Sequence, residues 1–234
     1  MKSRSRSPSL PLWLKLVSSA WLVVLVPVYW MEHGPANFLW LSDIALLVTV
    51  LALWLENRFL VSMMAVGVLL PEIFWNLDFF TRLLAGHDVL GLDATAYMFS
   101  PQIPWLTRGL SLFHVFLPAL LIFALLRLGY APRAFAAQVL LVWLVLPVSY
   151  LISDPQRNIN LVYGLSEVPQ TWLPDWLYLL AMMLLYVLLV SGPTHLVLKH
   201  VLVTRRGSGA TGRESSPPAP EGTDSRESDP ADTR

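Results

Sequence analysis

The chain has 234 residues, of which 55% are hydrophobic and only 14% are charged. This composition argues against a soluble globular fold and predicts a chain that crosses a membrane several times as α-helices. The basic and acidic residues cancel to a net charge of zero, and the absence of cysteine excludes disulfides, thiolate metal sites and a cysteine nucleophile.

Six apolar runs along the chain are each about 20 residues long, enough to cross roughly 30 Å of hydrocarbon. We therefore predict an all-α polytopic integral membrane protein with six transmembrane helices. A basic segment, residues 1–11, precedes the first run, which lacks a good signal-peptide cleavage site and is predicted to stay as a span. The predicted transmembrane domain is 12–198, with spans at 12–31, 37–55, 59–80, 110–128, 135–152 and 176–198.

Residues 199–234 begin as a basic juxtamembrane segment and continue as a tail of Ser, Pro, Gly and charged residues. The tail cannot bury a core, so we predict that it is disordered. Most Lys and Arg residues that flank the spans lie on the side of the two termini. Because basic residues mark the cytoplasmic side, both termini are predicted to be cytoplasmic, an N-in/C-in layout.

Polar side chains interrupt three of the spans at similar depth. At about 1.5 Å per residue, Asp43 and His114 lie about 9 Å below the outer ends of their spans and Glu72 about 12 Å below. Asn76 is four residues after Glu72 and shares its helix face. Asp78 is nearer the surface and is predicted to be a solvated boundary residue. These positions predict a polar pocket in the outer half of the membrane.

Three functions fit such a cluster. It could be structural, with buried polar groups that satisfy one another and fix helix packing. It could be an enzyme in which His114 acts as a general base on a serine hydroxyl, either Ser42 or Ser111, oriented by Asp43 or Glu72. It could be a small-molecule or proton carrier, although the inner half of the spans holds few ionisable groups.

A variant of the enzyme hypothesis places a metal ion on Asp43, Glu72 and His114, an N/O ligand set that suits Zn, Fe or Mn. The chain has no spaced motif such as H-E-x-x-H to support it. We therefore predict no metal and no cofactor.

Three short motifs resemble a six-span membrane family: WLSDIALL at the start of the second span, FH in the fourth, and RLGYAPR after it. The family includes uncharacterised bacterial proteins and an animal acyltransferase that acts on ether phospholipids. The resemblance places Ser42 at the family's cysteine and His114 at its histidine, while Trp40 replaces the family's first histidine. NINLVYGLSEVP, with Asn160, is similar to a later Asn-containing stretch. The resemblance implies acyl transfer and a bacterial inner membrane location.

The combined hypothesis is lipid acyl transfer or hydrolysis in the outer half of the bilayer. Ser42 would be the nucleophile and His114 the base, with Asp43 and Glu72 as orienting or charge-balancing groups. Asn76 would donate to a developing oxyanion. The substrate would also contact Arg108 and Asn160. The expected partners are membrane lipids and not nucleic acid, and the sequence does not identify protein partners.

Overall fold

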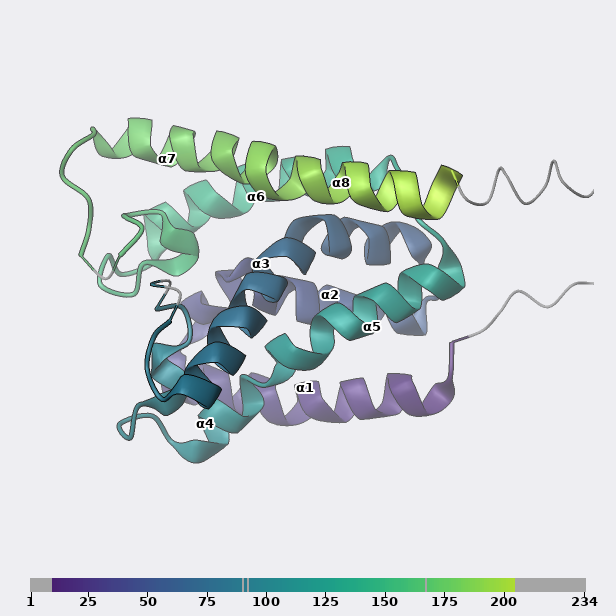
Figure 1. Cartoon of the computed structure of the whole chain (residues 1–234), viewed down its shortest axis with the longest axis horizontal. Coiled ribbons are helices and arrows are strands. Elements are labelled where there is room, and N and C mark those ends of the chain that lie inside the picture. Colours follow the sequence, from purple (N-terminus) through teal and green to yellow (C-terminus); the bar gives the residue numbers. More distant parts are fainter. Residues whose placement is uncertain (1–9, 90, 92, 167, 205–234) are drawn as a thin grey trace, which may run out of the picture.

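A computed structural model describes residues 10–89, 91, 93–166 and 168–204, and the described residues are helices and loops without strands (Figure 1). Five helical stretches are long and apolar enough to cross a membrane by length and composition. They are α1 (Leu12–His33), α3 (Arg58–Ala85), α4 with α5 (Trp105–Leu110, Phe113–Leu128), α6 (Ala134–Ile152) and α7 with α8 (Asp175–Leu185, Gly192–Lys199). The predicted all-α class is confirmed, and the predicted tail lies outside the described residues.

The second predicted span, 37–55, is shorter than expected. Its first residues belong to a 3₁₀ turn, η1 (Pro35–Leu39), and the α-helix α2 covers only Leu41–Trp54, which is 14 residues. At 1.5 Å per residue this helix is about 21 Å long, less than the thickness of a typical hydrocarbon core. Trp40, with φ −54° and ψ 129°, is extended and separates the 3₁₀ turn from α2, so α2 starts four residues later than the predicted span.

One end of the bundle holds both the start of α1 and the end of α8 (Figure 1). Here Lys15 and the backbone N–H of Leu10 both donate to Glu56 in the α2–α3 turn, at 2.7 and 3.1 Å. Tyr130 lies in the α5–α6 turn and forms a 2.5 Å hydrogen bond with His195 of α8. These contacts join the turns between helices to α1 and α8 at this end.

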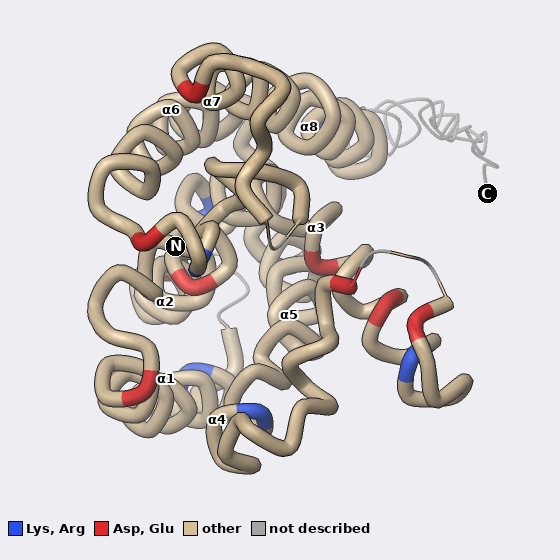
Figure 2. The backbone as a smooth tube through the Cα atoms, turned by 90° about the vertical axis from the view of Figure 1, so that its left-hand side faces the viewer, with Lys and Arg blue, Asp and Glu red and all other residues tan. Residues whose placement is uncertain are grey.

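The long connections, 86–104 and 153–174, lie at the opposite end, which Figure 2 views directly. They contain η2 (Ala96–Phe99) and η3 (Ile159–Leu161). The first connection covers Asp78, whose Oδ2 accepts hydrogen bonds from the backbone N–H and hydroxyl of Thr95 at 2.8 and 2.7 Å. Asp78 is fully buried. The prediction of a solvated boundary residue is therefore wrong, because α3 continues to Ala85 and the loop folds back over it.

The central helix, α3, packs against α2, α5 and α6. It contains Pro71, which has no backbone N–H and so leaves the carbonyl of Gly67 without its helical donor. The hydroxyl of Tyr186 donates to that carbonyl at 2.9 Å. Tyr186 begins η4 (Tyr186–Ser191), a π-helical segment between α7 and α8, so the last helix is attached to α3 where α3 lacks a backbone bond.

Candidate functional site

The centre of the candidate site is a hydrogen bond of 2.8 Å between Nδ1 of His114 and Oε2 of Glu72. Glu72 belongs to α3 and His114 to the first turn of α5, so the bond joins two helices. Glu72 is only 2% exposed, and the imidazole stacks on the ring of Trp75 with 4.6 Å between centroids. A buried carboxylate on one ring nitrogen fixes the orientation of the imidazole.

Asn76 joins the same two helices through its side-chain amide. Its Nδ2 donates to the backbone carbonyls of Glu72 and His114, both at 2.7 Å. The His114 carbonyl lacks a helical donor because the residue four positions later is Pro118. The amide has two N–H groups, and both are used. Asn76 therefore has no donor left for an oxyanion, and its role in this structure is to hold α3 and α5 together.

Asp43 lies in the first turn of α2 and is 4% exposed. Its Oδ2 accepts a 3.3 Å hydrogen bond from Asn37, and the Oδ1 of Asn37 accepts one of 2.9 Å from Arg157. The Asp43 carboxyl is also close enough to His114 and Glu72 to interact with their charges. The three ionisable residues that the sequence placed at one depth thus belong to one polar centre.

A second buried hydrogen bond lies beside this centre. The hydroxyls of Tyr29 in α1 and Ser111 after α4 are 2.6 Å apart, and Ser111 also donates to the carbonyl of Thr107 at 3.1 Å. Tyr97 of η2 lies near Ser111 as well, and burial raises the pKa of its phenol. Ser111 is therefore already bonded to neighbours, and no hydrogen bond of the described residues links it to the His114 ring.

Sequence reasoning missed four members of this centre. They are Tyr29, Asn37, Tyr97 and Arg157. Tyr29 carried a usable signal, because it lies at the predicted outer end of the first span. The other three come from η1 and the loops, where no periodicity indicates which way a side chain points.

The remaining predicted site residues lie around the centre without a direct contact to the imidazole. Ser42 is half-buried on α2, and no hydrogen bond of the described residues joins it to His114. Arg108 donates to the carbonyl of Met98 at 3.2 Å and so ties η2 to α4.

Asn160 supports the start of α2. Its Oδ1 accepts from the backbone N–H of Leu41 at 3.0 Å, and its Nδ2 donates to the carbonyl of Leu39 at 2.8 Å and to Ser149 at 3.0 Å. It thus supplies the cap that Trp40, the N-cap residue, does not. Its side-chain donors are used, so in this structure it positions the helix of Ser42 and Asp43.

The metal-ion variant finds no support in the geometry. Among the described residues, no group of three or more His, Asp or Glu side chains is placed to hold a metal ion. Glu72 and His114 bond to each other, and Oδ2 of Asp43 bonds to Asn37.

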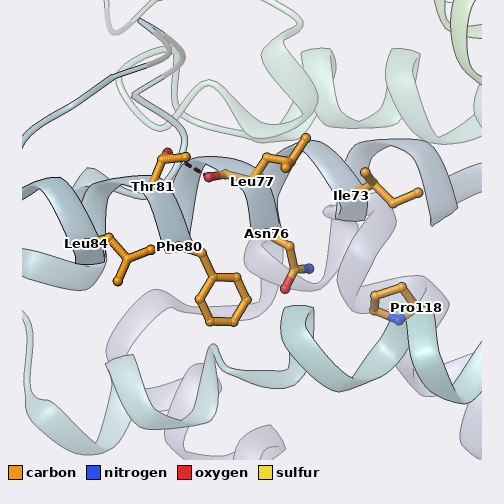
Figure 3. A pocket seen from close by; sticks show the side chains of 7 residues that line it. All are labelled: Ile73, Asn76, Leu77, Phe80, Thr81, Leu84 and Pro118. Carbon is orange, nitrogen blue, oxygen red and sulfur yellow. Dashed lines mark hydrogen bonds between the residues drawn. The ribbon is translucent and has the colours of Figure 1, made fainter.

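An apolar groove of about 320 Å³ runs along α3 beside Pro118 of α5 (Figure 3). Two polar residues line it, but their donors point to backbone carbonyls: Asn76 to those of Glu72 and His114, and Thr81 to that of Leu77 at 2.7 Å. The surface that lines the groove is therefore apolar. Its lining is Ile73, Asn76, Leu77, Phe80, Thr81, Leu84 and Pro118.

Comparison of the chain with protein-family models, with curated proteins and with solved structures finds no match. The resemblance seen in the sequence therefore stays a prediction.

Proposed function

We propose that the protein is a membrane enzyme that transfers or hydrolyses the acyl groups of lipids, with His114 as its general base. The observation that carries this proposal is the buried hydrogen bond between Glu72 and His114. A histidine held by a carboxylate on Nδ1 can accept a proton on Nε2, and none of the hydrogen bonds of the described residues uses that nitrogen. The stack on Trp75 holds the ring in place.

The membrane setting is part of the proposal. We place all six apolar segments across the bilayer, with α2 as a short crossing supported by the loop that contains Asn160. Basic residues mark the ends of the helices at the end of the bundle where α1 starts: Lys15, Arg58, Arg127, Arg133 and Lys199. This end would be cytoplasmic, so the polar centre would face the outer half of a bacterial inner membrane.

The reaction needs a hydroxyl nucleophile, an ester carbonyl and a base. His114 Nε2 takes the proton as the hydroxyl oxygen bonds to the carbonyl carbon, and the leaving alcohol recovers that proton when the ester C–O bond breaks. Ser42 is the candidate nucleophile for a two-step reaction through an acyl-enzyme. Water or the hydroxyl of a second lipid is the nucleophile in a one-step reaction. In both, Glu72 stabilises the imidazolium that forms.

The proposal is tested by comparing the lipids of a deletion strain complemented with wild type, His114→Gln or Ser42→Ala. We expect an altered acyl composition that wild type restores and His114→Gln does not. If Ser42→Ala restores the lipid composition, and a serine-directed acylating probe labels this variant as it labels wild type, the reaction is the one-step reaction. Lipids unchanged by the deletion would contradict the proposal.

A structural role is the competing proposal, and the Asn76 bonds favour it. They show that polar side chains of the centre join α3 to α5 directly. If the Glu72 and His114 pair acts only as a further link of this kind, His114→Gln will lower stability and leave the lipids unchanged. Measuring protein abundance alongside the lipids separates the two.

A further inference from the structure

The Asp43 carboxyl is unusual among the buried groups of the polar centre. It is 96% buried, yet its Oδ1 has no hydrogen-bond partner among the described residues. A buried carboxylate oxygen without a donor is costly, because the group has lost its hydration and gained nothing in return. The described residues therefore leave this oxygen without the donor that would offset its burial.

The other half of the same carboxyl is held firmly. Asn37 donates to Oδ2, and Arg157 in turn donates to the side-chain oxygen of Asn37 at 2.9 Å and to the backbone carbonyl of His33. A chain of three side chains thus fixes the direction of the carboxyl. The result is an oriented acceptor whose free oxygen belongs to the centre that contains His114.

The neighbouring charges indicate what kind of donor fits. Glu72 is hydrogen-bonded to the His114 imidazole, and Asp43 interacts with the charges of both residues. This balance favours a neutral or positively charged donor and disfavours a further anion beside the carboxyls. A primary ammonium group carries both the N–H donors and the charge that the site requires.

We propose that Asp43 Oδ1 accepts a hydrogen bond from the ammonium headgroup of a lipid and so selects headgroups that carry N–H. This inference deepens the proposed function, since the lipid would be the substrate of the His114 centre. Binding is nevertheless separate from turnover, so binding can be tested even if the lipid chemistry fails.

A second buried aspartate provides a matched control. Asp78 also has one carboxylate oxygen without a partner, but its other oxygen is bonded to the backbone and hydroxyl of Thr95 under the loop. The charges that act on Asp43 are those of His114 and Glu72. Asp78→Asn therefore makes the same chemical change outside the proposed headgroup site.

The test compares lipids that share acyl chains and differ only in methylation of the headgroup nitrogen. Native mass spectrometry of the purified full chain measures how much phosphatidylethanolamine and phosphatidylcholine it retains. Because phosphatidylcholine has no N–H, we expect wild type to retain phosphatidylethanolamine about tenfold better, the value of one hydrogen bond to a charged group. Asp43→Asn should bring the ratio close to one, and Asp78→Asn should leave it unchanged.

Equal retention of the two lipids by wild type would overturn the proposal. This comparison needs no variant, so it decides the question even if Asp43→Asn folds poorly. An unchanged ratio in Asp43→Asn, or an equal loss in Asp78→Asn, would also overturn it. Retention of phosphatidylglycerol equal to that of phosphatidylethanolamine would overturn the choice of an ammonium group. If headgroup selection is found but no turnover occurs, the headgroup site stands and the acyl-transfer proposal fails.

Discussion

The side-chain amide of Asn76 donates to the backbone carbonyl of His114 that Pro118 leaves without a helical donor. A proline in α5 and an asparagine in α3 are thus complementary, although 42 positions separate them. The bond places the start of α5 against α3, and this contact is what brings the imidazole of His114 within reach of Glu72.

The Asn76 and Pro118 pairing predicts a specific pattern of stability. Asn76→Ala should lower the free energy of unfolding by about 1–2 kcal/mol, because it leaves the His114 carbonyl without a donor. In a Pro118→Ala background the new backbone N–H at position 118 satisfies the His114 carbonyl, so Asn76→Ala should cost less. Unfolding in bicelles, followed by tryptophan fluorescence, measures both values. An equal loss in the two backgrounds would show that the pairing does not exist.

Tyr186 and Pro71 form an equivalent pairing at the last helix. Tyr186→Phe should lower the free energy of unfolding by about 0.6–2 kcal/mol, since the Gly67 carbonyl loses its donor. The loss should shrink when Pro71→Ala restores the helical N–H. The same unfolding experiment applies, and a Tyr186→Phe cost that is independent of residue 71 would be the contrary result.

Close packing of α3 on α6 depends on Gly67. A Cβ at this position would overlap the side-chain amide of Gln138, which is almost fully buried. Gly67→Ala is expected to destabilise the protein by about 1–3 kcal/mol, and Gln138→Ala should relieve most of that cost. Gly109→Ala in α4 is the matched control, because its Cβ meets nothing within 4 Å. If both alanine substitutions behave alike, the close approach is unimportant.

The cytoplasmic end that we propose contains a pH-dependent contact. The hydrogen bond from Lys15, with a smaller one from the backbone of Leu10, holds the pKa of Glu56 below its ordinary value. A lowered carboxyl pKa adds stability that is present above the unfolded-state pKa and is lost as pH falls through the folded-state pKa. This contribution should therefore begin to fall below about pH 4.5, the ordinary pKa of the group, and continue to fall toward more acid pH.

Because Glu56 is partly exposed, the expected size is only about 0.2–1 kcal/mol, and salt should reduce it. Comparing wild type with Glu56→Gln between pH 7 and pH 3.5 measures it. The difference between the two proteins should narrow toward acid pH. A difference that widens on acidification would mean that the sign of the pKa shift is wrong.

The sequence predicted the meeting of Glu72 and His114 because both lie within regular helices, where position converts directly into depth. It did not predict the role of Asn76, since the carbonyl it satisfies becomes available only through Pro118 on another helix. Asp78 was misplaced for a different reason. Its environment depends on how the loop containing Thr95 folds back, which no helical or strand pattern encodes.

The length of α2 was also not predictable from hydropathy alone. Hydropathy continues from residue 37 to 55, but η1 takes the first part of that run and Asn160, from a distant loop, caps the helix that remains. The family resemblance drew attention to the segment around Ser42. It did not indicate that Ser42 would have no hydrogen bond to His114 among the described residues.

The most direct test of the central claim is phospholipid turnover by the purified protein in liposomes, with wild type, His114→Gln and Glu72→Gln compared at equal folded amounts. Loss of a general base removes about 10²–10⁴-fold of a reaction rate. We predict measurable acyl release or exchange by wild type, a loss of that size in His114→Gln, and a smaller loss in Glu72→Gln, which keeps the shape but not the charge. The same turnover by wild type and His114→Gln, or none by folded wild type, would contradict the account.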